Sequence, residues 1–166
     1  MSILLLGLKS IYVACICYAM ASDFRSLIIP NWIVVVLVSS FVISAAIRMQ
    51  PGSILAHLAV AAMVLLFFLA FFLAGWVAGG DVKLIAAIAL WIGPENASLF
   101  VLLTAFLGAL LALALLLIKK HGGVVGGTLG HNWLYQRARA LAERSQCPYG
   151  VAIGLAALLS SAGVFK

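Results

Sequence analysis

Six apolar stretches, separated by short breaks, decide what this sequence can fold into. Most of them approach the roughly 20 apolar residues that a helix needs to cross a lipid core about 30 Å thick. The breaks contain residues that end helices, for example Pro30, Pro51 and Gly93-Pro94. This pattern predicts an all-α integral membrane protein with six transmembrane segments, the fourth of them short. The predicted segments are residues 3–21, 32–47, 54–76, 82–92, 98–118 and 149–165.

The composition excludes a water-soluble globule. Hydrophobic residues make up 66% of the 166 residues and charged residues only 8%, whereas a soluble domain contains about 25% charged residues. The first apolar stretch could also be a cleaved signal peptide, since Ala19-Met20-Ala21 resembles a signal-peptidase site. No positive charge precedes this stretch, however, and it is long for a signal peptide. We therefore interpret it as the first transmembrane segment.

The net charge of +6 does not indicate nucleic-acid binding, and the three cysteines do not indicate a metal site. The basic residues are not clustered as a footprint for phosphates, so the expected partner is a lipid bilayer and not a nucleic acid. Cys15, Cys17 and Cys147 form neither a C-x-x-C pair nor a zinc-binding spacing. The histidines, His57 among them, are also scattered. We expect no metal, no cofactor and no disulfide.

The distribution of basic residues predicts the orientation in the membrane, because cytoplasmic loops carry an excess of Lys and Arg. If the loop at residues 119–147 is cytoplasmic, only Arg48 and Lys166 lie outside, with Lys9 in the first segment. Both termini are then outside the cytoplasm. Within the basic loop, Asn132 is expected to begin a short amphipathic helix. The basic residues placed on the cytoplasmic side are Arg25, Lys83, Lys119, Lys120, Arg137, Arg139 and Arg144.

The short fourth segment predicts an unusual position for Asp81. Its 11 residues, 82–92, extend about 16 Å as a helix, which is half of the lipid core. If Gly93-Pro94 marks its outer end, Asp81 at its inner end lies within the membrane. Non-helical backbone at that depth must be buried in protein or line a wet cavity. Gly79 and Gly80 have the conformational freedom that such a break requires.

Two of the four acidic residues are candidates for function. Glu95 and Glu143 lie in a turn and in the polar loop, where we expect solvated charges. Asp23 and Asp81 each lie where an apolar stretch meets a break, on the same predicted side of the membrane. An ionisable group at membrane depth is costly and is a functional hypothesis by default. The alternative is that each aspartate only caps a helix. The four acidic residues are Asp23, Asp81, Glu95 and Glu143.

A pair of neighbouring carboxylates can hydrolyse a peptide bond without a metal. Like charges at close range cannot both ionise cheaply, so the pair holds a single proton near neutrality. The ionised member takes a proton from water, and the protonated member donates to the carbonyl oxygen under attack. Arg25 and Lys83 each follow an aspartate by two residues. Such a cation either holds the carboxylate ionised or extends to the lipid phosphates.

Three segments carry a resemblance to a known family. Residues 23–31 read DFRSLIIPN, residues 79–84 read GGDVKL, and residues 148–153 read PYGVAI. In this order they resemble the D-x-R…I-P-N, G-D-V-K-L and P-Y-G-V-A-I segments of the type IV prepilin peptidase family, the GxGD-type aspartic proteases of membranes. The family pattern G-x-G-D has glycine at position 78, where this chain has Ala78.

The resemblance implies an aspartic endopeptidase with Asp23 and Asp81 as its catalytic dyad. Residues 1–166 would form one membrane-embedded peptidase domain in the bacterial inner membrane, with its active site facing the cytoplasm. The implied substrates are type IV prepilins or pseudopilins, cut between a leader and an apolar helix. Because the chain starts directly with a span, it resembles the short Flp-type form without a methyltransferase domain. The residues expected to support the site are Arg25, Pro30, Asn31, Gly79, Gly80, Lys83, Pro148, Tyr149 and Gly150.

Two other functions use the same aspartates. A small transporter or proton-relay protein also has carboxylates facing a cavity, but it would contain paired half-helices in two repeats. A structural scaffold would tolerate asparagine at both positions, because asparagine also caps helices. The sequence shows a single short segment, which favours the peptidase.

Overall fold

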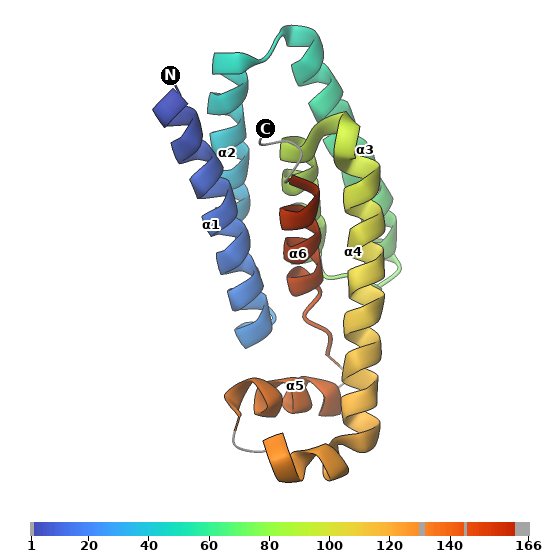
Figure 1. Cartoon of the computed structure of the whole chain (residues 1–166). Helices are drawn as coiled ribbons and strands as arrows, with labels where there is room; N and C mark the ends of the chain where they lie inside the picture. Colours follow the sequence, from blue (N-terminus) through green and yellow to red (C-terminus); the bar gives the residue numbers. More distant parts are fainter. Residues whose placement is uncertain (1, 130–131, 145, 162–166) are drawn as a thin grey trace.

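The fold is all-α, as the sequence predicts. The computed structural model describes residues 2–129, 132–144 and 146–161, and for residues 2, 48 and 121–129 it describes the backbone alone. Within these residues the chain forms six helices, which pack as an elongated bundle with one helix lying across its end (Figure 1). The helices are α1 (Ser2–Ser26), α2 (Asn31–Arg48), α3 (Pro51–Leu73), α4 (Gly79–Leu129), α5 (Trp133–Glu143) and α6 (Tyr149–Ser161).

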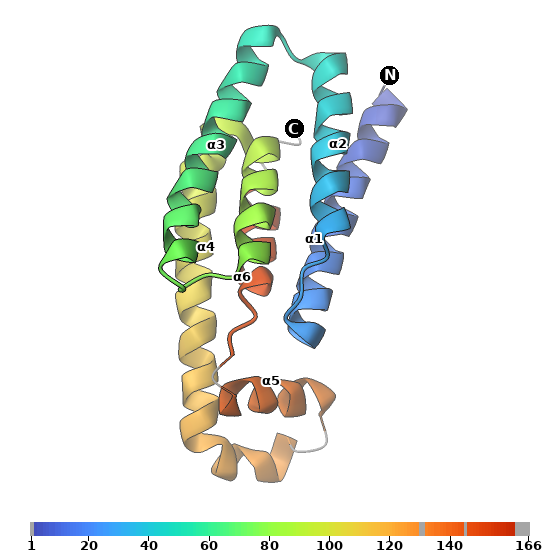
Figure 2. The same cartoon turned by 180° about the vertical axis from the view of Figure 1, so that it is seen from behind.

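Helix α4 consists of two helices that meet at Gly93. This residue has φ 70° and ψ −174°, a conformation outside the helical region. The chain reverses its direction there, so residues 79–92 form a short arm and residues 94–129 a long arm. The long arm first runs beside α3 and then extends past it, and its last turns cross the end of the bundle below α5 (Figures 1 and 2). Pro94 follows at the first turn of the long arm, where proline costs no hydrogen bond. The predicted short fourth segment is confirmed, together with its end at Gly93-Pro94.

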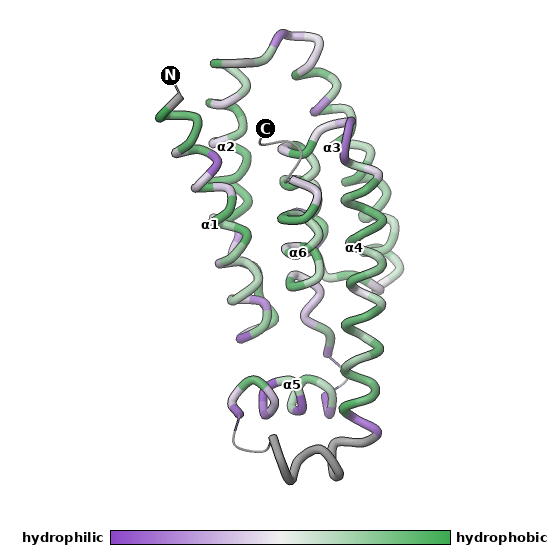
Figure 3. The backbone as a smooth tube through the Cα atoms, in the orientation of Figure 1, coloured by the Kyte–Doolittle hydropathy of each residue, from purple (hydrophilic) through white to green (hydrophobic). Residues whose placement is uncertain are grey.

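Length and composition identify a membrane protein. Three helical stretches are long and apolar enough to cross a bilayer, namely Ile3–Ser26, Pro51–Leu73 and Gly79–Lys120, and α2 and α6 are shorter apolar helices. Hydrophobic residues dominate these helices, whereas α5 alternates between hydrophilic and hydrophobic residues (Figure 3). The first turn of α1 and the last turn of α6 lie at the end of the bundle opposite α5 (Figure 1). The count of six spans and the orientation relative to the cytoplasm remain predictions.

The segment predicted as a basic loop, residues 119–147, contains more helix than expected. The backbone of α4 continues as a helix to Leu129, because glycines lower helix propensity without preventing helical hydrogen bonds. The short helix α5 follows, and the Asn132 side chain caps it by accepting a hydrogen bond from the Leu134 N–H at 2.9 Å. This cap confirms the predicted start of the helix.

The short arm of α4 is the centre of the bundle. Leu84, Ile85 and Ile88 are fully buried there. The Trp91 Nε1–H donates to the Leu37 carbonyl of α2 at 2.8 Å, and His57 Nδ1 of α3 donates to the Leu90 carbonyl at 2.8 Å. His57, to which the sequence assigned no role, therefore satisfies a carbonyl at the end of this arm. These contacts hold the arm at a fixed depth between its neighbours.

Gly93 is expected to contribute to the stability of the fold. A side chain in its backbone conformation is strained, and a Cβ atom would lie 2.3 Å from Cε1 of His57. Backbone strain of this kind and overpacking each cost about 1–3 kcal/mol. We predict that Gly93→Ala lowers the free energy of unfolding by about 2 kcal/mol or more. A lower midpoint of thermal unfolding of the detergent-purified protein would measure this effect.

Gly52 provides the matched control, because a Cβ atom there meets nothing within 4 Å. Gly52→Ala should leave the midpoint unchanged or raise it slightly, since alanine favours a helix. An equal midpoint for Gly93→Ala and wild type would contradict the reversal of the chain at Gly93.

Candidate active site

Asp23 lies in the last turn of α1 and is held by the start of α6. Its side chain is 4% exposed, and its Oδ2 atom accepts a hydrogen bond from the Gly150 N–H at 2.7 Å. Gly150 is the second residue of α6, where backbone N–H groups have no partner within the helix. A Cβ atom at Gly150 would lie 2.9 Å from Asp23 Cγ. The absence of a side chain thus allows the helix start to approach the carboxylate.

Asp81 lies in the first turn of the short arm of α4. Its residue is 7% exposed, and its backbone N–H donates to the Ala78 carbonyl at 3.1 Å. Gly79 and Gly80 are the first two residues of α4, so the helix begins at the predicted break. Gly80 lies against the backbone and side chain of Ile29. The chain between α1 and α2 is thereby brought next to Asp81.

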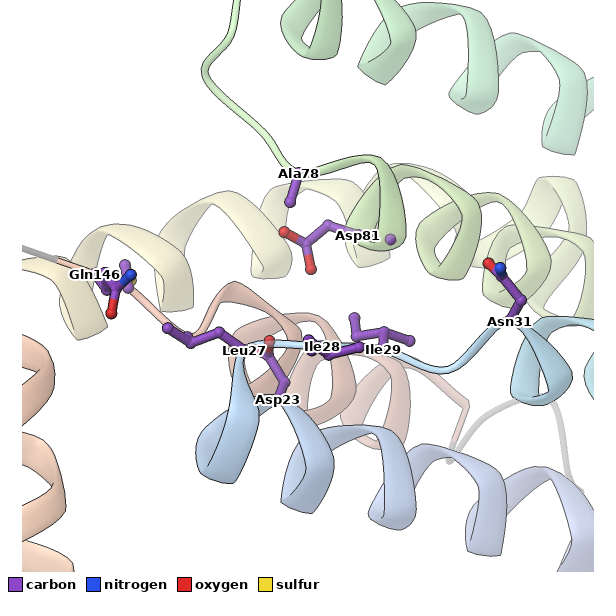
Figure 4. Close-up of a pocket in the computed structure, with 10 residues that line it drawn as sticks. Asp23, Leu27, Ile28, Ile29, Asn31, Ala78, Asp81 and Gln146 are labelled. Carbon is purple, nitrogen blue, oxygen red and sulfur yellow. The ribbon is translucent and has the colours of Figure 1, made fainter.

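Both aspartates line one pocket with a volume of about 400 Å³. In Figure 4 the two carboxyl groups point toward the same space, one from α1 and one from the short arm of α4. They are close enough for their charges to interact. The volume lies within the range of small ligand sites and exceeds that of several water molecules. The other residues that line the pocket are Leu27, Ile28, Ile29, Asn31, Ala78, Gly80, Gln146 and Cys147.

A strained turn borders this pocket. Leu27, the residue after α1, has a φ of 57°, which is rare for a bulky side chain. Its N–H donates to the Asp23 carbonyl at 2.8 Å, and the Ser22 hydroxyl donates to the Ile28 carbonyl at 2.7 Å. A conformation of this kind costs about 1–3 kcal/mol and occurs often at functional sites. The strained conformation of Leu27 occurs next to the end of α1 that carries Asp23.

Arg137 of α5 holds the end of α1. Its Nε–H donates to the Phe24 carbonyl at 3.0 Å, and a second guanidinium nitrogen donates to the Arg25 carbonyl. The last carbonyls of a helix have no partner within the helix, and a cation also complements the negative end of its dipole. The buried residues Leu141 and Ala142 hold α5 itself by packing against the long arm of α4. The sequence predicted α5 but not this contact.

The predicted supporting residues divide into three groups. Asn31 and Gly80 line the pocket with the aspartates, and Gly150 contacts Asp23 directly. Arg25 and Lys83 are exposed and do not line the pocket. The remaining residues form the elements that border the site: Gly79 starts α4, Pro30 is the N-cap of α2, Pro148 is fully buried before α6, and the ring of Tyr149 lies against Gly108.

The sequence analysis did not identify Gln146 and Cys147 as site residues. Cys147 is exposed at the pocket, and its one sequence signal is its position directly before Pro148. Partial burial of the thiol, and then the negative charges of Asp23 and Asp81, raise the pKa of Cys147. The thiol is therefore neutral at pH 7, unlike the thiolate of a cysteine nucleophile.

Comparison with known proteins gives one match. No curated protein and no solved structure matches the chain. The model of the type IV leader peptidase family matches residues 10–113, which is more than half of the chain and includes both aspartates. The P-Y-G-V-A-I segment at residues 148–153 lies outside the matched range and reaches the same pocket through Gly150. The chain therefore belongs to the type IV leader peptidase family.

Proposed function

We propose that the chain is a leader peptidase that cleaves the N-terminal leader of type IV prepilins or pseudopilins, including Flp-like ones. In this proposal the chain is an aspartic endopeptidase, and Asp23 and Asp81 activate the water that attacks the peptide bond. One observation carries it: two buried carboxyl groups from different helices line the same pocket in a chain of this family. Both lie at the end of apolar helices, where water can reach a membrane-bound substrate.

The hydrogen bond from Gly150 supports a different role for each aspartate in this proposal. A backbone N–H that donates to a carboxylate favours its ionised form, and the start of α6 adds a positive partial charge. Asp23 is therefore the base, and Asp81 carries the shared proton. Asp23 takes a proton from water as the water oxygen attacks the peptide carbonyl, and Asp81 donates to the carbonyl oxygen. The C–N bond then breaks, and the leaving nitrogen receives a proton from the dyad.

The basic residues near α5 support a position at the inner face of the bacterial cytoplasmic membrane. Arg137, Arg139 and Arg144 lie on or next to α5. Helix α5 lies at the end of the bundle where α1, the helix that carries Asp23, ends (Figure 1). An excess of Lys and Arg is typical of the cytoplasmic side. The proposed site therefore faces the cytoplasm, at the boundary where a leader would join an apolar helix.

Replacement of either aspartate is predicted to stop cleavage. Asp23→Asn removes the base and Asp81→Asn removes the acid, and loss of either kind of group costs about 10²–10⁴-fold in rate. Co-expression with a candidate prepilin would show an uncut leader for both variants and a cut leader for wild type. Membrane fractionation should show normal insertion of both variants, because asparagine retains the size and the hydrogen bonding of aspartate.

Cleavage that survives in either variant would exclude that residue from the dyad and favour the scaffold. Proton transport by wild type without cleavage would favour the proton-relay alternative. A chelator should leave the cleavage rate unchanged, and inhibition that added metal reverses would contradict the aspartic mechanism.

Modification of Cys147 is predicted to block the site. A maleimide adduct would occupy the pocket of about 400 Å³ and lower the cleavage rate by about 10-fold or more. Because the thiol pKa is raised, labelling should be slow at pH 7 and faster at higher pH, as mass spectrometry would show. Cys147→Ala should retain most activity and resist the reagent, whereas Cys17→Ala should remain sensitive. Inactivity of Cys147→Ala would instead point to a thiol nucleophile.

The contact of Arg137 with α1 is predicted to support the cleavage rate. Arg137→Gln removes charged hydrogen bonds to the end of the helix that carries Asp23, and a small misplacement of a catalytic group costs about 10-fold or more. Arg139 is the matched control, since its ion pair with Glu143 is exposed. Arg139→Gln should change the rate by less than about 2-fold. Equal rates for both variants, measured with the same prepilin, would show that Arg137 does not position Asp23.

A further inference from the structure

An apolar groove lies beside the candidate active site. Its volume is about 360 Å³, and its walls are formed by α2 and α3, with the short arm of α4 as its floor. Figure 2 shows the short arm between these two helices. We call it the α2–α3 groove; the residues that characterise it are Val34, Val38, Ala61, Ala62, Ala86 and Ala87.

The side chains of the groove suit a helix. Ala61 and Ala62 on the wall, and Ala86 and Ala87 on the floor, are small. Small residues allow two helix backbones to approach closely in a membrane, where packing drives helix association. The lining is otherwise aliphatic, with Lys83 as its one charged member. A partner for this surface must therefore be apolar along most of its length.

One end of the groove lies next to the pocket that holds the aspartates. Lys83 lies at one end of the groove, two residues after Asp81. Its Nζ atom donates to the Asn31 side-chain oxygen at 3.3 Å, and Asn31 lines the pocket. From Lys83 to Leu90 the floor extends about 10 Å away from the aspartates. A peptide that leaves the groove at this end is therefore next to the pocket of the aspartates.

We propose that the α2–α3 groove binds the apolar membrane helix of the substrate and presents the end of that helix to Asp23 and Asp81. The inference rests on the proposed peptidase function and names the surface that such a substrate needs. A peptide in lipid must be helical to satisfy its backbone groups, but a scissile bond must be extended and accessible to water. At Asn31 and Lys83 the lining changes from the apolar groove to the polar pocket. The substrate helix can end at this point.

Photo-crosslinking in membranes tests this surface. A benzophenone amino acid replaces Ala62, an exposed residue of the groove wall, in the inactive Asp81→Asn variant co-expressed with a prepilin. The control places it at Leu102, which is 67% exposed on the long arm of α4 and outside the groove. We expect at least about 10-fold more adduct with the prepilin helix from position 62. Equal yields, or adducts with lipid alone at position 62, would overturn the proposal.

A groove-filling variant gives a second readout. Ala62→Trp should lower cleavage of the full prepilin by about 10-fold or more, and Leu102→Trp should leave it unchanged. A short leader peptide without the apolar helix should be cleaved equally by wild type and both variants. Full activity of Ala62→Trp on the prepilin would overturn the proposed docking in the groove but not the proposed peptidase function. Failure of wild type to cleave either substrate would refute the peptidase function, while the crosslinks would still report on docking.

Discussion

The hydrogen bond between the Gly150 N–H and Asp23 is the interaction on which the site depends. A carboxylate that is 4% exposed in an apolar layer requires a donor, because an unpaired buried charge is very costly. The start of α6 supplies this donor without a bulky side chain. It also joins two residues that are 127 positions apart and so ties the end of α1 to the start of α6. This contact positions the Asp23 side chain.

The reversal at Gly93 sets the depth of the second carboxylate. The short arm spans residues 79–92, or about 20 Å, which is less than a lipid core of about 30 Å. A helix that crossed the whole core would carry Asp81 to the membrane surface, away from the end of α1. His57 and Trp91 hold the outer end of the arm. The position of Asp81 thus follows from contacts at the opposite end of the same helix.

Local signals made much of this arrangement predictable from sequence. Hydropathy located the apolar helices, Gly93-Pro94 located the reversal, and the scarcity of acids singled out the two aspartates. For Arg25 and Lys83 the sequence left open whether they hold the carboxylates ionised or extend to the lipid phosphates. Both side chains are exposed and lie outside the pocket, which favours the second alternative. Residues two positions apart on a helix do not share a face. Both aspartates lie within helical turns, which directs the following cations elsewhere.

The contacts that escaped prediction are those between distant segments. Arg137 holds the end of α1 through backbone carbonyls, which have no signature in the sequence, and Cys147 reaches the pocket because α6 starts beside Asp23. The left-handed conformation of Leu27 likewise results from packing and not from residue type.

The geometry also bears on how a cleavage position could be chosen. The pocket around the two aspartates offers few side chains that could recognise a specific substrate sequence, since several of its lining residues are aliphatic. A helix seated in the α2–α3 groove would instead be cut at a fixed distance from its apolar contacts. Selection would then depend on where the substrate helix ends relative to the membrane. A short helix and a strained turn at the site suit such a selection, because they hold the two aspartates at a fixed depth relative to the membrane.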